Sequence, residues 1–76
     1  MNIHLKVQDI LQEQLGLDLK SLTPDATFHN LGADSLDMVE ITMTCEEEFD
    51  IDIPDAEAAK FETIYDLTNF ITTQKL

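Results

Sequence analysis

The sequence predicts an all-α domain, a small four-helix bundle with a short third helix and a long loop between helices one and two. Apolar residues recur at three- and four-residue spacing in three segments, and residues that start or stop helices stand between those segments. No segment alternates with the period of a strand. A chain of 76 residues is too short to divide into two cores, so we assign residues 1–76 to a single domain.

The first predicted helix covers the segment "NIHLKVQDILQEQLG" near the start of the chain. Its apolar positions recur at helical spacing and form one face of an amphipathic helix. They are Ile3, Val7, Ile10, Leu11 and Leu15. Gly16 follows directly and predicts the helix end.

Residues 17–34, here called the strap, join the first helix to the second. The tripeptide "TPD" at 23–25 indicates a turn within it. A loop of this length is uncommon in a compact domain unless it has a function. We expect it to be ordered, because apolar side chains along it can anchor it to the bundle: Leu17, Leu19, Leu22, Phe28 and Leu31.

The second helix is predicted to begin at Asp34 or Ser35 and to end near Phe49. Asp34 is a favourable N-cap residue, and Asp37 stands three positions later, as in a capping box. At about 100° per residue the helix has two apolar faces. The face predicted to enter the core holds Met38, Ile41, Cys45 and Phe49. The face predicted to stay exposed holds Leu36, Val39 and Met43, with Glu40 and Glu47 beside them.

Two further helices are predicted after residue 50. Pro54 suits the first turn of a short third helix. Thr63 can cap the fourth helix, with Asp66 at the third position after the cap. The apolar residues of the fourth helix again show helical spacing: Ile64, Leu67, Phe70 and Ile71.

The charge of the chain is strongly negative and unevenly distributed. Sixteen acids against four lysines, with no arginine, give a formal net charge of -12. Phosphate backbones bind through Lys and Arg, so nucleic acid is excluded as a partner, and an anionic membrane surface is disfavoured. Residues 31–62 alone hold eleven acids against Lys60. Because such repulsion opposes compaction, we interpret this acidic segment as a surface for basic partners.

The first residues of the chain and the lengths of its apolar runs indicate where in the cell the protein is expected. The first residues, "MNIHLKVQDI", lack the apolar core of a signal peptide, and no apolar run approaches the length of a membrane span. A single cysteine, Cys45, forms no intramolecular disulfide. We therefore expect a cytoplasmic protein without membrane insertion.

Catalytic sites are poorly supported by the sequence. "GADSL" around Ser35 lacks the second glycine of a nucleophile elbow, and a small bundle has little room for a substrate pocket beside His29. Cys45 lies on the predicted core face, which favours a buried structural thiol. We expect no enzymatic activity.

A calcium loop in "DIDIPDAEAAKFE" is also disfavoured. An EF-hand would need an oxygen ligand at Pro54, a glycine at Asp55 and a bidentate glutamate at Phe61, and none is present. Neither Cys nor His occurs elsewhere at metal-ligand spacing, so no metal site is predicted.

Ser35 allows two interpretations. A serine at a helix start is commonly a cap. Alternatively, its hydroxyl is exposed at a helix N-terminus, where backbone amides and the helix dipole accommodate an attached phosphate. Gly32 in the preceding turn would help to direct the side chain outward.

The segment "FHNLGADSLDMVEITMTCEEEFDIDIPDAE" resembles the acyl carrier proteins, and the similarity extends over nearly the whole chain. The resemblance implies that residues 1–76 are one acyl carrier domain. It implies that Ser35 is esterified by 4′-phosphopantetheine from coenzyme A, and that acyl groups are held as thioesters on the terminal thiol of that arm. It also implies that Asp34 assists the metal ion of the phosphopantetheinyl transferase.

In this family, partners bind the helix that follows the modified serine. The residues so implied are Leu36, Asp37, Val39, Glu40, Met43, Glu46 and Glu47. The expected partners are the phosphopantetheinyl transferase and acyl-loading, condensing and tailoring enzymes with basic docking patches, which would meet a monomeric carrier.

The pathway stays open at this point. The spacing "FHNL" is one residue tighter than in most fatty-acid carriers and matches many carriers of polyketide and nonribosomal pathways. An aminoacyl or peptidyl carrier is one alternative. An unmodified acidic interaction module, in which Ser35 keeps a free hydroxyl, is another.

Overall fold

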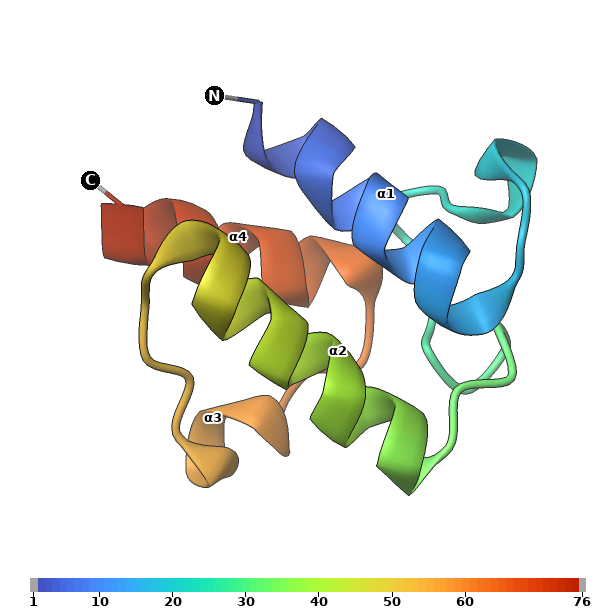
Figure 1. Cartoon of the computed structure of the whole chain (residues 1–76). Helices are drawn as coiled ribbons and strands as arrows, with labels where there is room; N and C mark the ends of the chain where they lie inside the picture. The colour runs from blue at the N-terminus through green and yellow to red at the C-terminus, as the bar shows by residue number, and fades with distance from the viewer. Residues whose placement is uncertain (1, 76) are drawn as a thin grey trace.

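The computed structural model describes residues 2–75 and has the predicted all-α architecture (Figure 1). Its elements are α1 (Ile3–Leu15), the 3-10 turn η1 (Leu19–Ser21), α2 (Ser35–Phe49), α3 (Asp55–Ala58) and α4 (Ile64–Lys75). In this part of the chain the only pairing of extended backbone is an isolated bridge between Thr27 and Thr63. The predicted four-helix class, with its short third member, is confirmed.

Helix α1 begins and ends as its sequence indicates. The Asn2 side-chain oxygen accepts a hydrogen bond from the Leu5 amide at 3.1 Å, which caps the first turn. Gly16 adopts a left-handed conformation (φ 67°), and its N–H donates to the Gln12 carbonyl at 2.9 Å. A glycine takes this conformation without steric cost, so the predicted helix end at Gly16 is confirmed.

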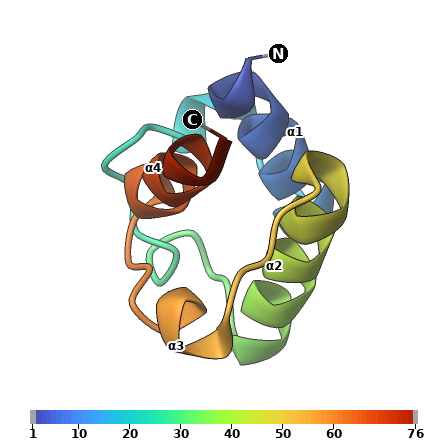
Figure 2. The same cartoon turned by 90° about the vertical axis from the view of Figure 1, so that its left-hand side faces the viewer.

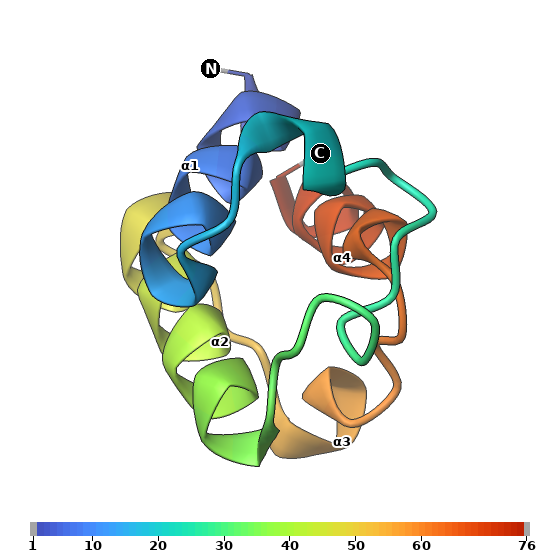
Figure 3. The ribbon, with the colours of Figure 1, turned by 90° about the vertical axis from the view of Figure 1, so that its right-hand side faces the viewer.

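The three long helices enclose one core. Figures 2 and 3 show α1 and α2 on one side of the molecule, α4 on the other and α3 at one end. Side chains fill the space between these ribbons. The buried apolar residues are Val7, Ile10, Leu11, Leu22, Phe28, Ile41, Cys45, Phe49, Ile53, Ile64, Leu67 and Ile71. Every helix except α3 contributes to this list, as do the strap and the α2–α3 connection.

The strap is ordered because its backbone binds the start of α4. Phe28 N–H donates to the Glu62 carbonyl at 2.9 Å, and Ile64 N–H donates to the Ala26 carbonyl at 3.1 Å. The Gln8 side chain of α1 donates to the Leu22 carbonyl at 3.3 Å. The strap therefore passes from α1 to α4 and returns to α2, as Figure 3 shows.

Four of the five predicted strap anchors face the core. Leu22 and Phe28 are buried, and Leu17 and Leu31 pack partly against the core. The fifth prediction, Leu19, is wrong, because its side chain is 53% exposed. The turn η1 explains the difference: three residues of 3-10 helix rotate the chain between Leu17 and Leu22, and Leu19 is turned to solvent.

The predicted start of α4 is also confirmed. Thr63 Oγ1 accepts from the Asp66 amide, and Asp66 Oδ2 accepts from the Thr63 amide, both at 3.1 Å. A second backbone bond to Asp66 comes from the Glu62 amide at 2.9 Å. Hydrogen bonds from these two backbone amides lower the pKa of the Asp66 carboxyl, and the bond from Glu62 has the larger effect. Pro54 was expected in the first turn of α3 and instead occupies the N-cap position before Asp55.

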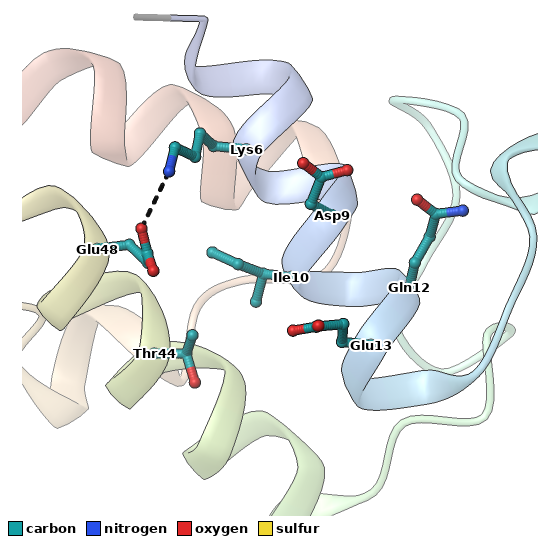
Figure 4. A pocket seen from close by; sticks show the side chains of 7 residues that line it. All are labelled: Lys6, Asp9, Ile10, Gln12, Glu13, Thr44 and Glu48. Atoms are coloured by element: carbon teal, nitrogen blue, oxygen red, sulfur yellow. Dashed lines mark hydrogen bonds and ion pairs between the residues drawn. The ribbon is translucent and has the colours of Figure 1, made fainter.

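Three of the four lysines lie against the acidic part of the chain. Lys6 Nζ pairs with Glu48 at 3.1 Å (Figure 4), and Lys60 pairs with Glu57 at 3.7 Å. Lys75 Nζ donates to the Phe49 carbonyl at 3.0 Å, at the C-terminal end of α2. A positive charge at this end interacts favourably with the helix dipole, so Lys75 joins α4 to the end of α2.

One buried polar atom suggests a stabilising substitution. Within the described residues, the Thr68 hydroxyl oxygen of α4 is buried without a hydrogen-bond partner. An unsatisfied hydroxyl lowers stability by about 1 kcal/mol or more, whereas valine has nearly the same shape and no polar atom. We expect Thr68→Val to raise the melting temperature by about 5 °C in thermal unfolding followed by circular dichroism.

The matched control is Thr72→Val on the same helix, where the exposed hydroxyl donates to the Thr68 carbonyl at 2.9 Å. This change should leave the melting temperature nearly unaltered. A Thr68→Val protein that melts no higher than wild type would contradict the prediction.

Candidate functional site

The first turn of α2 presents Ser35 to solvent. Asp34 Oδ1 accepts from the Asp37 amide at 2.9 Å, and Asp37 Oδ2 accepts from the Asp34 amide at 3.1 Å, which completes the predicted capping box. Asp34 therefore supplies the cap, and Ser35 is the first helical residue with an exposed side chain. Of the two interpretations of Ser35, the structure favours a hydroxyl free for another role.

The turn before Ser35 is fixed by backbone hydrogen bonds. Ala33 N–H donates to the Phe28 carbonyl at 3.0 Å, and Gly32 N–H donates to the His29 carbonyl at 3.1 Å. Gly32 adopts φ 83°, a conformation that strains other residues. Because Phe28 is buried, this turn attaches the start of α2 to the core.

The two predicted faces of α2 are present. Ile41, Cys45 and Phe49 are fully buried, while Met38 is only half-buried, because it lies at the edge of the core near α3. The opposite side, here called the exposed α2 face, consists of Leu36, Val39, Met43, Glu40 and Glu47. Its three apolar side chains are each more than half exposed. An apolar strip with acidic neighbours is a typical protein-binding surface.

The acids predicted to bind partners have different surroundings. Glu47 is exposed. Glu40 is also exposed but accepts from the Gln14 side chain of α1 at 2.6 Å. Glu46 is partly buried, and its carboxylate accepts from the Ile53 amide at 2.9 Å, which holds the α2–α3 connection against the helix. The sequence did not indicate this structural role of Glu46.

A groove of about 500 Å³ runs between α2 and α3 and includes Ser35. Its lining is mostly apolar: Met38, Val39, Thr42, Met43, Glu46, Ile53, Asp55, Ala58, Ala59 and Phe61 join Ser35 there. The α2 residues of this list extend from Ser35 to Glu46, eleven steps along the helix or about 16 Å at the rise of an α-helix. Sequence reasoning missed the groove. The signal was present in the small residues Ala58 and Ala59, which leave room beside α2.

The thiol of Cys45 is unreactive in this fold. Its side chain is fully buried, and burial raises the pKa of the thiol to about 12. The carboxylates of Glu46 and Glu48 act in the same direction because they disfavour a nearby thiolate. The predicted structural thiol is consistent with this position.

The described residues contain neither a metal-binding cluster nor a membrane-spanning helix. In residues 2–75, no group of three or more His, Cys, Asp or Glu side chains is arranged to hold a metal ion. Over the same residues, no helix has both the length and the apolar character needed to cross a membrane.

Comparisons with known proteins agree on one family. A family model described as "Phosphopantetheine attachment site" matches residues 5–71. A protein named acyl carrier protein from Bdellovibrio bacteriovorus is 50% identical over 72 residues, which is 93% of this chain and 92% of that protein. Another of that name from Cyanidioschyzon merolae is 49% identical over 71 residues, covering 92% of this chain and 78% of the relative.

A solved structure supports the same relationship. The crystal structure of an acyl carrier protein from Thermotoga maritima superimposes with a TM-score of 0.82 at 32% sequence identity. The match covers 93% of this chain and 84% of that one.

The buried thiol leads to a test of accessibility. We expect iodoacetamide at pH 8 to leave Cys45 of the folded, unmodified protein unlabelled, because the thiol is both protonated and inaccessible. In denaturant the same reagent should add one adduct, detected by intact mass. Rapid labelling of the folded protein would contradict the buried position.

Proposed function

Because the chain belongs to the acyl carrier proteins, whose cofactor is 4′-phosphopantetheine, we propose that Ser35 is the residue to which this arm is attached. The observation that carries the proposal is the position of Ser35, exposed as the first residue of α2 while Asp34 provides the cap. When attached, the arm supplies a terminal thiol on which acyl groups are held as thioesters.

The residues around Ser35 fit a phosphate ester. The first intrahelical bond of α2 is donated by the Met38 amide to the Asp34 carbonyl at 3.0 Å. The Ser35 and Leu36 amides therefore precede the helical ladder, at the positive end of the helix dipole. These groups favour an attached anion at this position. The negative charge of Asp34 opposes it, which is consistent with the proposed role of Asp34 beside the metal ion of the transferase.

The exposed α2 face is our proposed surface for partner enzymes. Leu36, Val39 and Met43 offer apolar contact, and Glu40 and Glu47 attract basic residues. The partners would be the phosphopantetheinyl transferase and the acyl-loading, condensing and tailoring enzymes of fatty-acid, polyketide or related metabolism. Docking through exposed charges is fast and sensitive to salt, as a shuttle between enzymes requires. The protein itself would catalyse no step and act as a monomer in the cytoplasm.

The groove between α2 and α3 is our proposed site for the acyl chain. It includes Ser35, and its walls are mainly apolar. Burial of apolar chain surface there is favourable by about 25 cal/mol per Å². A chain held in the groove would be partly removed from water between visits to enzymes.

Attachment at Ser35 is tested by intact mass. We expect wild-type protein incubated with coenzyme A, magnesium and a promiscuous phosphopantetheinyl transferase to gain one phosphopantetheine. Ser35→Ala should gain none while keeping the helical circular dichroism of wild type. If the folded wild type gains nothing, or the variant is still modified, the assignment of Ser35 is wrong.

The docking surface is tested by charge reversal. We expect Glu40→Lys combined with Glu47→Lys to weaken docking, seen as a roughly tenfold or greater loss of kcat/KM for the transferase, because both carboxylates attract a basic partner. The matched control is Asp18→Lys with Glu62→Lys, which makes the same change of charge at exposed positions outside α2. Equal losses in the two double variants would indicate an effect of net charge alone.

A further inference from the structure

Two polar side chains are buried among residues 2–75, and they have different partners. Gln8 of α1 donates to the Leu22 carbonyl, so it joins a helix to the strap. Thr42 of α2 is 8% exposed, and its hydroxyl donates to the Val39 carbonyl of its own helix at 2.9 Å. Valine would fill the same space without a polar atom. The Thr42 hydroxyl therefore makes no evident contribution to the packing of one element on another.

The Thr42 side chain lines the α2–α3 groove. A hydroxyl has one hydrogen to donate and two lone pairs that accept. Its hydrogen is engaged by the Val39 carbonyl, so toward the groove the oxygen can serve as an acceptor. The neighbouring groove residues Met38, Ile53 and Phe61 are apolar. Glu46 and Asp55 also line the groove, and the Glu46 carboxylate is engaged by the Ile53 amide. A donor placed beside Thr42 would find an acceptor in the threonine oxygen.

We propose that Thr42 is a specificity-determining residue, which makes the groove favour acyl chains bearing a 3-hydroxyl group over 3-oxo or saturated chains of the same length. The inference rests on the proposed function, in which a chain attached through Ser35 enters this groove. A 3-hydroxyl donates its hydrogen to Thr42 Oγ1. A 3-oxo group can only accept, so the existing Thr42–Val39 bond would leave it unpaired, at a free-energy cost.

The length of the groove limits how much of the chain can extend beyond Thr42. Thr42 is seven residues from Ser35 along α2, or about 10 Å, and only about 6 Å of the helix remain from Thr42 to Glu46 at the far end. A chain that runs from the Ser35 end has room for only a few carbons beyond Thr42. A 3-hydroxyhexanoyl group, with three carbons after the hydroxyl carbon, suits this space.

The amides of the phosphopantetheine arm are a second source of donors. Each arm amide also has a carbonyl, and burial of that group without a partner among apolar side chains costs free energy. The acyl chain therefore suits the inner groove better than the arm does. The experiment distinguishes a donor on the arm from a donor on the acyl chain. Every loaded form has the same arm, so a difference between loaded forms comes from the chain.

The test compares loaded proteins that differ only in the chain. Wild type and Thr42→Val are loaded from the corresponding coenzyme A thioesters with hexanoyl, 3-oxohexanoyl or 3-hydroxyhexanoyl groups, and their melting temperatures are measured. The quantity compared is the melting temperature of the 3-hydroxyhexanoyl form minus that of the hexanoyl form of the same protein. We expect this difference to be about 4 °C smaller in Thr42→Val than in wild type. The difference in melting temperature between the 3-hydroxyhexanoyl and 3-oxohexanoyl forms should decrease by a similar amount in Thr42→Val.

The matched control is Thr44→Val on the same helix. Like the Thr42 hydroxyl, the Thr44 hydroxyl donates to a carbonyl of its own helix, that of Glu40, at 2.9 Å. Its side chain, however, faces the hollow between α1 and α2, beside Ile10 and Glu13 (Figure 4). This variant should keep the wild-type difference between the hydroxylated and saturated forms. Thr42→Ser, which retains the hydroxyl, should keep it too.

Each other result overturns the proposal. If the difference in melting temperature between the hydroxylated and saturated forms is unchanged in Thr42→Val, the hydroxyl of Thr42 does not recognise the chain. The same conclusion follows if Thr44→Val loses this difference to the same extent as Thr42→Val. Equal destabilisation of the hexanoyl and 3-hydroxyhexanoyl forms shows that the effect of Thr42→Val does not depend on the hydroxyl of the chain. If no form can be loaded on Ser35, the proposed function fails along with the inference; normal loading with no chain-dependent difference overturns the inference alone.

Discussion

The rotational phase of α2 is the constraint on which the other features depend. The reciprocal bonds between Asp34 and Asp37 fix where the helix begins, and each following residue is rotated by about 100° from the one before. A start displaced by one residue would turn Cys45 toward solvent and an acid toward the core. Because the phase is fixed, one helix presents Ser35, the proposed attachment residue, together with a core face, a groove wall and an exposed apolar strip. A short domain thereby combines its structural and functional requirements in a single element.

The acidic charge of the middle segment suits the proposed docking to basic partners but is unfavourable for folding. Residues 31–62 hold eleven acids and one lysine, so their mutual repulsion opposes compaction. The structure places Lys6 of α1 and Lys75 of α4 at the C-terminal end of α2, against Glu48 and the Phe49 carbonyl. The two other long helices thus supply positive charge where the acids are densest, while Glu40 and Glu47 of α2 have no lysine partner among the described residues.

Helix ends and helix faces could be predicted from the sequence because they depend on local rules. Gly16, Asp34 and Thr63 mark boundaries through their own backbone preferences, and the two faces of α2 follow from helical spacing. Irregular turns and features of the tertiary arrangement could not be predicted in this way. The outward turn of Leu19 depends on a 3-10 turn without a strong local signal. The bond from the Ile53 amide to Glu46, and the groove between α2 and α3, require the tertiary arrangement of the α2–α3 connection. The exposed position of Ser35 and the exposed α2 face could therefore be predicted from the sequence, but the shape of the groove could not.

Burial of Cys45 bears on the lifetime of the cargo. A thioester on a tethered arm is susceptible to exchange with any thiolate on the same molecule, because the tether gives a high effective concentration. Cys45 is the only cysteine of the chain, and its thiol is held protonated inside the core. Self-acylation would require the domain to open first. The packing that stabilises the bundle thereby also isolates the carried group from the only thiol of the chain.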